Sequence, residues 1–191
     1  MPHRKTARFP SGWLVAALLV ASGVLWAVMF FGTLAHLRQL AGGLAPFDVR
    51  PLGYSYEDAQ AFLSAIGPVG RAYYLDPELV LDAFYPPLYA VSRALALWWL
   101  TTPGRLREGA LPLAWRRALV AIPILMACLD GGVENVCIAK MLRQWPDLSP
   151  GLVQVASAAT QVKLLLGVLT EISMAALAVV TVLHWRRRRP A

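Results

Sequence analysis

The residues best suited to chemistry are polar and ionisable side chains that fall inside strongly apolar stretches of the chain. Charged groups are costly in hydrocarbon, so in membrane segments they usually face other helices, where they pair or line a site. The candidate ligand-binding residues are His36, Asp82, Tyr89, Arg93, Asp130, Glu134, Asn135, Thr160, Lys163 and Glu171. Oxygen-rich sites of this kind suit a hard cation or protons shared between carboxyl groups.

Helical spacing places these residues on a small number of helix faces, because residues three and four apart share a face. The first face carries Asp82, Pro86, Tyr89 and Arg93, the second Asp130 and Glu134 beside Asn135, and the third Ser157, Thr160, Lys163, Gly167 and Glu171. Gly131 and Gly132 would allow another helix to approach closely. We expect the three faces to point toward one another.

The charges on these faces do not balance. Four carboxyl groups stand against Lys163 and Arg93, so the interior needs protonated acids, a charged His36, or a bound cation or cationic ligand. If the ligand is a metal, Asp82, Asp130 and Glu134 are its predicted ligands. The structural alternative pairs Asp82 with Lys163 and Glu171 with Arg93, and leaves the remaining acids neutral.

No motif names a reaction or a cofactor. The sequence contains no HExxH, P-loop, GxSxG or dinucleotide fingerprint, and Cys128 and Cys137 form no CxxC pair. Three hypotheses follow: a membrane-embedded protein that binds a cation, a proton or a small amphiphile; a lipid-modifying enzyme with a buried carboxylate as acid or base; and a non-catalytic scaffold or accessory subunit. Whether the protein is an enzyme stays open.

Composition indicates a membrane protein. Of the 191 residues 58% are hydrophobic and 15% are charged, whereas about a quarter are charged in ordinary soluble domains. The net charge of +7 comes from basic residues at the edges of apolar segments, which argues against a nucleic-acid-binding surface and follows the positive-inside pattern. These residues are Arg4, Lys5, Arg8, Arg105, Arg107, Arg116, Arg117 and Arg186, Arg187, Arg188, Arg189, of which the last four could contact anionic lipid.

We predict an all-α integral membrane protein that forms one domain over 1–191. Four transmembrane helices are expected at about 13–36, 77–100, 115–138 and 153–185, joined into a four-helix bundle. Ser11, Asp76-Pro77 and Ser149-Pro150 supply helix starts. A signal peptide cleaved near Thr33-Leu34-Ala35 is the competing interpretation of the first segment, but its apolar run is longer than such peptides usually carry.

The charge distribution sets the expected orientation. The linker from Thr102 to Arg117 carries four arginines and one acid, so both termini and this linker are expected in the cytoplasm, with the chain in the inner membrane. The outer loop, about 37–76, carries a capping-box pattern at Ser55 and Asp58 before a short amphipathic helix that is either a structural cover or a lid. The acid-rich faces lie in the outer half of the bundle. Four helices are few for a monomeric transporter, which leaves homo-oligomerisation open.

Overall fold

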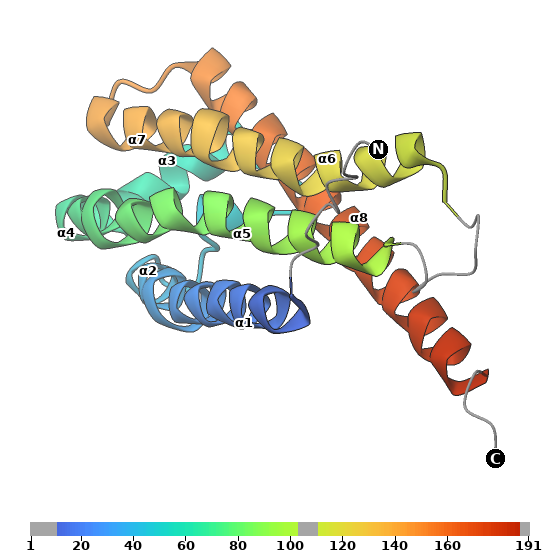
Figure 1. Ribbon diagram of the computed structural model, residues 1–191. Helices are drawn as coiled ribbons and strands as arrows, with labels where there is room; N and C mark the ends of the chain where they lie inside the picture. Colours follow the sequence, from blue (N-terminus) through green and yellow to red (C-terminus); the bar gives the residue numbers. More distant parts are fainter. Residues whose placement is uncertain (1–10, 103–110, 188–191) are drawn as a thin grey trace, which may run out of the picture.

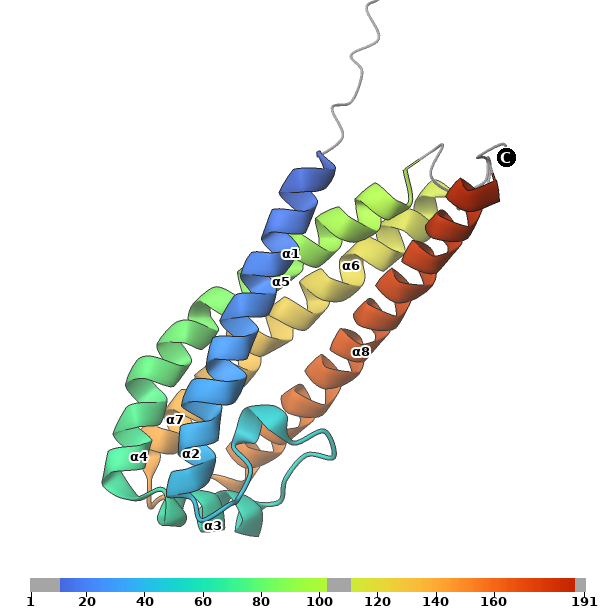
Figure 2. The same cartoon turned by 90° about the horizontal axis from the view of Figure 1, so that it is seen from below.

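The computed structural model describes residues 11–102 and 111–187, and these residues form helices and loops without any strand. Long helical segments lie side by side and make an elongated molecule (Figures 1 and 2). Three of them are long and apolar enough to cross a membrane, namely Gly12–Leu40, Leu113–Gln144 and Pro150–Arg186. The fold is therefore all-helical with at least these three membrane-compatible helices.

The first long segment joins α1 (Gly12–Val28), the π-turn η1 (Met29–Thr33) and α2 (Leu34–Leu40). Its start is as predicted, because the Ser11 hydroxyl accepts a hydrogen bond from the Leu14 backbone N–H at 3.2 Å. The helix continues beyond residue 36, the expected end of the membrane span, to Leu40, and it contains the π-turn η1.

The second long segment starts earlier than the sequence suggested. It joins α4 (Gly67–Tyr73), the π-turn η3 (Tyr74–Glu78) and α5 (Leu79–Leu100). The predicted start at Asp76-Pro77 is wrong, because Pro77 lies inside η3 in a helix that begins at Gly67. Gly67, at φ +63°, makes the sharp break that separates this segment from the preceding helix α3 (Tyr56–Ala65).

The third and fourth long segments face each other across a short loop. The third joins α6 (Leu113–Leu129), the π-turn η4 (Asp130–Glu134) and α7 (Asn135–Gln144), so it extends past the predicted end at 138. The fourth is one uninterrupted helix, α8 (Pro150–Arg187). It begins at the predicted Ser149-Pro150 pair, where Ser149 O accepts the first helical hydrogen bond, from Val153 N.

The loop between α2 and α4 folds over one end of the molecule, which we call the α3 end. Its short 3-10 turn η2 (Phe47–Val49) carries Phe47 into a fully buried cluster of aromatic rings with Phe62 and Tyr74. The capping box that starts α3 is confirmed: Ser55 Oγ accepts from Asp58 N at 3.1 Å, and Asp58 Oδ2 accepts from Ser55 N at 2.9 Å. That bond from the Ser55 N–H holds the pKa of the Asp58 carboxyl below its usual value.

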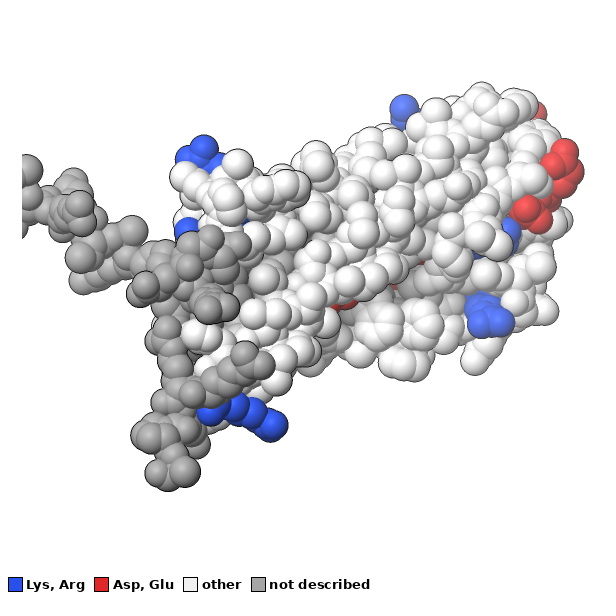
Figure 3. Space-filling view, turned by 90° about the vertical axis from the view of Figure 1, so that its right-hand side faces the viewer, with Lys and Arg blue, Asp and Glu red and all other residues white. Residues whose placement is uncertain are grey.

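The flank of the molecule is apolar. In Figure 3 lysines and arginines lie mainly toward the two ends, surface acids gather at one end, and a little red shows deep in a furrow midway along the face. Trp13, Val20, Phe31, Phe84 and Ile172 are among the large apolar side chains exposed along the helices. Of the basic residues that the sequence singled out, Arg4, Lys5, Arg8, Arg105, Arg107, Arg188 and Arg189 lie outside the described residues.

Candidate functional site

Lys163 on α8 is the centre of the site, buried with 5% of its surface exposed. Its Nζ atom lies 2.7 Å from Glu134 Oε2, 2.9 Å from Asp130 Oδ1 and 3.8 Å from Asp48 Oδ1. Asp130 and Glu134 begin and end the π-turn η4, while Asp48 comes from the loop turn η2. One buried ammonium thus joins α8, the third long segment and the loop that covers the α3 end.

Hydroxyl groups complete the contacts of two of these acids. Thr160, almost one turn before Lys163 on α8, donates to Glu134 Oε1 at 2.7 Å. The Tyr74 hydroxyl donates to Asp48 Oδ2 in a very short hydrogen bond between two buried side chains. Glu134 and Asp48 are therefore fixed from two sides each, once by Lys163 and once by a hydroxyl.

Asp82 and Glu78 are buried without such partners. Asp82 is 3% exposed, and its Oδ2 atom makes no hydrogen bond within the described part of the chain. Glu78 is fully buried one turn earlier, and neither of its carboxyl oxygens makes a well-aligned hydrogen bond to a described residue, although Thr33 of η1 lies beside it. The Asp82 carbonyl, which Pro86 leaves without its helical donor, accepts from Asn135 Nδ2 at 3.3 Å.

We call these residues the acid cluster: Asp48, Glu78, Asp82, Asp130 and Glu134 around Lys163. Five buried carboxyl groups face one ammonium, so full ionisation would leave four uncompensated negative charges. Burying charges without compensation is strongly unfavourable. The acid cluster therefore needs protons or another positive charge in addition to Lys163.

Of the three π-turns within the described residues, two supply three of the five acids of the acid cluster: η3 supplies Glu78, and η4 supplies Asp130 and Glu134. Each of the three is closed by an i→i+5 backbone bond, from Leu34 N to Met29 O, Leu79 N to Tyr74 O, and Asn135 N to Asp130 O. A π-turn adds a residue to the turn and is frequent at functional sites. Here the turns bring Thr33, Tyr74, Glu78, Asp130 and Glu134 to one level of the molecule.

A second polar pair lies farther from the α3 end. Arg93 Nε bonds Glu171 Oε1 at 3.0 Å, and Arg93 Nη1 donates to Ser22 Oγ at 2.6 Å. The guanidinium also lies over the ring of Tyr89, 4.6 Å from its centroid. The pairing of Glu171 with Arg93 is thus present, whereas Lys163 pairs with Asp130 and Glu134 instead of Asp82.

A cavity of about 330 Å³ opens beside the acid cluster between α1 and α8. Asp48, Asp82, Asp130 and Lys163 line its polar side. Its apolar side comes mainly from Trp26, Met29, Phe30, Met126, Leu164 and Val168. An adjoining cavity of about 460 Å³ shares Trp26, Tyr85 and Val168 with the first and reaches Tyr89, Arg93 and Glu171. The two cavities form one groove, which we call the α1/α8 groove.

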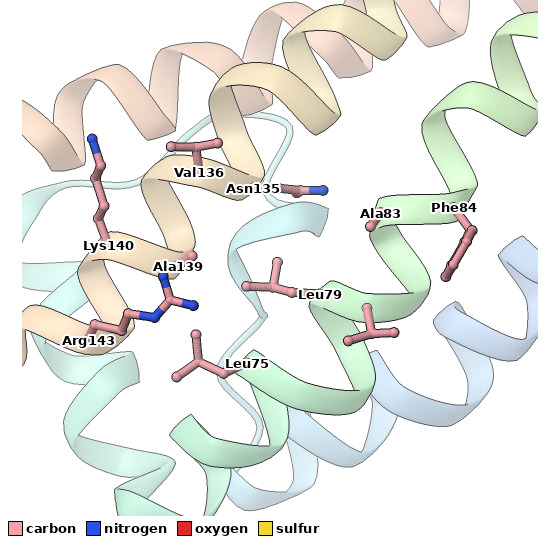
Figure 4. A pocket seen from close by; sticks show the side chains of 10 residues that line it. Leu75, Leu79, Ala83, Phe84, Asn135, Val136, Ala139, Lys140 and Arg143 are labelled. Carbon is pink, nitrogen blue, oxygen red and sulfur yellow. The ribbon is translucent and has the colours of Figure 1, made fainter.

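A further depression, of about 530 Å³, lies on another side of the molecule. Figure 4 shows it between Leu75, Leu79 and Ala83 on one segment and Val136, Ala139 and Arg143 on another. Leucine, alanine and valine side chains make up most of its wall, and none of the five carboxyl groups of the acid cluster lines it.

The structure brings together Asp82, Asp130, Glu134, Asn135, Thr160 and Lys163, as the three predicted faces implied. It places Arg93 and Glu171 in the separate pair, with the Tyr89 ring beneath the Arg93 guanidinium. His36 lies outside both, exposed and packed edge-on against the Tyr73 ring at 4.6 Å. No three His, Cys, Asp or Glu side chains of residues 11–102 and 111–187 are arranged to hold a metal ion, so the predicted metal set of Asp82, Asp130 and Glu134 is not assembled around one.

Sequence reasoning missed Asp48, Tyr74 and Glu78. A signal existed for the last two, because residues 74, 78 and 82 follow one another at intervals of four on one helix face. The helix start assumed at Asp76-Pro77 left Tyr74 outside the predicted helix, whereas Glu78 lay inside it, four residues before Asp82, and was overlooked. Asp48 gave no periodic signal, since it lies in a loop whose path depends on the packing of Phe47.

Comparison with known proteins adds no relative: no protein-family model matches the sequence, and no curated protein or solved structure matches the chain, so its function is argued from the geometry above.

Proposed function

We propose that this chain is a multi-pass inner-membrane protein that binds a positively charged ligand at the acid cluster. One observation carries the proposal. Lys163 is already engaged by Asp130 and Glu134, while the buried Asp82 carboxyl keeps an unpartnered oxygen and lines the α1/α8 groove. A cation placed there would reduce the excess negative charge that burial makes costly.

The proposed membrane arrangement has four spans. Gly67–Leu100 lies alongside the three apolar helices and matches them in length, although Arg71, Glu78 and Asp82 make it more polar. Its polar residues Glu78, Asp82 and Ser92 are buried, whereas Val80, Phe84 and Val91 are exposed. Such a helix can cross a bilayer because its neighbours shield the polar face. The acid cluster then lies in the half of the membrane nearest the α3 end.

The other functions considered fit the contacts less well. A scaffold requires only completed structural pairs, which Arg93 and Glu171 provide but Asp82 and Glu78 do not. An enzyme that uses a buried carboxylate as acid or base would also need a second group free to assist it. Lys163, the expected assistant, is held by two carboxyl groups, and His36 lies outside the acid cluster.

Thermal unfolding of the purified full chain in a nonionic detergent tests the proposal. Probes are the chlorides of sodium, magnesium, tetramethylammonium and dodecylammonium, applied to wild type, Asp82→Asn and Asp76→Asn. Asp76 is the matched control, since it is an exposed acid on the same helical segment. A ligand at about 100 times its Kd stabilises the folded state by about 2.7 kcal/mol.

We expect at least one cationic probe to raise the Tm of wild type and of Asp76→Asn, and to lose that effect in Asp82→Asn. If none of the four cations acts, or if Asp82→Asn responds like wild type, the acid cluster is not a cation site.

A further inference from the structure

We infer that the ligand of the acid cluster is a single-chain cationic amphiphile, which enters sideways from the bilayer through the α1/α8 groove. The inference rests on the proposed function and names the ligand class. It places an ammonium headgroup against Asp82 and a hydrocarbon chain along the groove toward Glu171.

The helix packing leaves this side of the molecule open. α1 packs on α5, and α8 packs mainly on α6, so α1 and α8 face each other across the groove. Figure 2 shows these two helices diverging away from the α3 end. Trp26 of α1 and Val168 of α8 line both cavities and are about half exposed, at 45% and 56%. A lipid chain can therefore reach the groove from the flank.

The headgroup end favours an organic ammonium. Asp82 and Asp130 supply carboxyl oxygens there, and Trp26 and Tyr85 supply aromatic rings in the same cavity. Aromatic faces beside carboxylates are typical of ammonium recognition, through cation–π attraction. A metal ion has less to hold it, because the described carboxyl groups do not converge into a metal-binding set.

The remainder of the groove suits a hydrocarbon chain. From Asp82 it continues past Met126, Leu164 and Val168 before it meets the Arg93–Glu171 pair. Cavities of about 330 and 460 Å³ fall within the size range of small-molecule sites, roughly 300–1,000 Å³. A free inorganic cation would leave this apolar length unused.

Gly23 offers a way to block the chain without touching the acids. It lines the larger cavity, and a Cβ atom built on it meets nothing within 4 Å, so Gly23→Leu places its side chain in the groove. Gly32 is the matched control, since it lies on the same helical segment, is exposed, and also has free space around a Cβ atom.

The experiment compares dodecylammonium, tetramethylammonium and dodecanoate by the concentration that gives half of the maximal Tm rise. For wild type and Gly32→Leu we expect dodecylammonium to act at a concentration at least tenfold lower than tetramethylammonium. Gly23→Leu should raise the dodecylammonium concentration at least tenfold and leave tetramethylammonium unchanged. Dodecanoate should have no effect that depends on Asp82.

The outcomes distinguish failure of the amphiphile inference from failure of the proposed cation site. Equal potency of tetramethylammonium and dodecylammonium, or a Gly23→Leu variant that behaves like Gly32→Leu, overturns the amphiphile while the cation site stands. If only sodium or magnesium raises the Tm, and Asp82→Asn loses that rise, the ligand is a metal cation and the amphiphile inference is wrong. Absence of any Asp82-dependent response overturns both.

Discussion

At the scale of single residues, Lys163 and Asp82 have opposite roles in stability. Lys163 is the only ammonium among five buried carboxyl groups of the described chain, so Lys163→Met leaves those groups without their base. Breaking a buried ion pair by removing one partner costs about 3–5 kcal/mol. We expect Lys163→Met to lower the free energy of unfolding by about that amount, measured by denaturant titration in detergent.

The matched control for this substitution is Lys140→Met, which removes an exposed lysine and should change the free energy of unfolding by less than about 0.5 kcal/mol. Asp82→Asn should not destabilise the ligand-free protein, because it removes a buried carboxyl group whose Oδ2 has no hydrogen-bond partner among the described residues. Similar losses in Lys163→Met and Asp82→Asn would contradict the assignment of Lys163 as the central base.

At the scale of elements, the loop that carries Asp48 depends on one close approach to α8. Gly53 has φ +76°, and a Cβ atom there would lie 2.6 Å from the buried Ser157 Oγ and 2.0 Å from Gln161 Nε2, the end of an exposed side chain that can turn away. Ser157 Oγ also accepts a hydrogen bond from Tyr54 N at 2.8 Å, which ties the loop to α8. Gly53→Ala should therefore displace this loop and loosen the contact between Asp48 and Lys163.

Gly53→Ala can destabilise the protein through the positive φ of the residue or through its close approach to α8, and Gly42→Ala separates these two causes. Gly42 also has positive φ, at +63°, but a Cβ atom there meets nothing within 4 Å. We expect Gly42→Ala to cost about 1–2 kcal/mol of stability, the usual penalty of the left-handed conformation, and Gly53→Ala to cost clearly more. Equal Tm losses for the two variants would show that the approach to α8 contributes nothing.

The elements also show which parts of the structure the sequence could predict. Apolar length and capping residues correctly placed the helix starts at Ser11, Ser55 and Ser149-Pro150, because these signals are local. The π-turns were not predictable from periodicity that assumes 3.6 residues per turn. Pro77 was misjudged for this reason: a proline is common at the first position of a helix, but here a π-turn accommodates it inside a longer helix.

The site was predictable in part. Six of the ten candidate residues meet because buried polar faces of neighbouring helices must point inward, which follows from the cost of exposing charge to lipid. The partner of Lys163 was not predictable, since Asp82 and Glu134 fall in the same predicted outer layer and Asp130 only about one helical turn deeper. Only the packing of η4 against α8 places Asp130 and Glu134 nearer to Nζ.

At the scale of the whole molecule, the number and orientation of the spans decide in which half of the membrane the acid cluster lies. Leu52 and Asp147 lie in loops at the same α3 end, where the Tyr56 hydroxyl donates to Leu148 O at 3.4 Å. Trp115 lies near the start of α6, and the long segment Gly67–Leu100 separates it from Leu52 in the chain. If all four long segments cross, Leu52 and Asp147 face one side of the membrane and Trp115 faces the other.

Single-cysteine labelling with a membrane-impermeant maleimide measures this arrangement in right-side-out vesicles. The background lacks both native cysteines, Cys128 and Cys137, and the probes replace the exposed residues Leu52, Asp147 and Trp115. With arginines concentrated in the linker that precedes α6, we expect labelling of Leu52→Cys and Asp147→Cys in intact vesicles, and of Trp115→Cys only after permeabilisation.

Labelling of only one of Leu52→Cys and Asp147→Cys would mean that Gly67–Leu100 does not cross the membrane, because the helix Leu113–Gln144 would then place the two residues on opposite sides. Labelling of Trp115→Cys alone would keep four spans but invert them, and would place the acid cluster in the cytoplasmic half of the membrane.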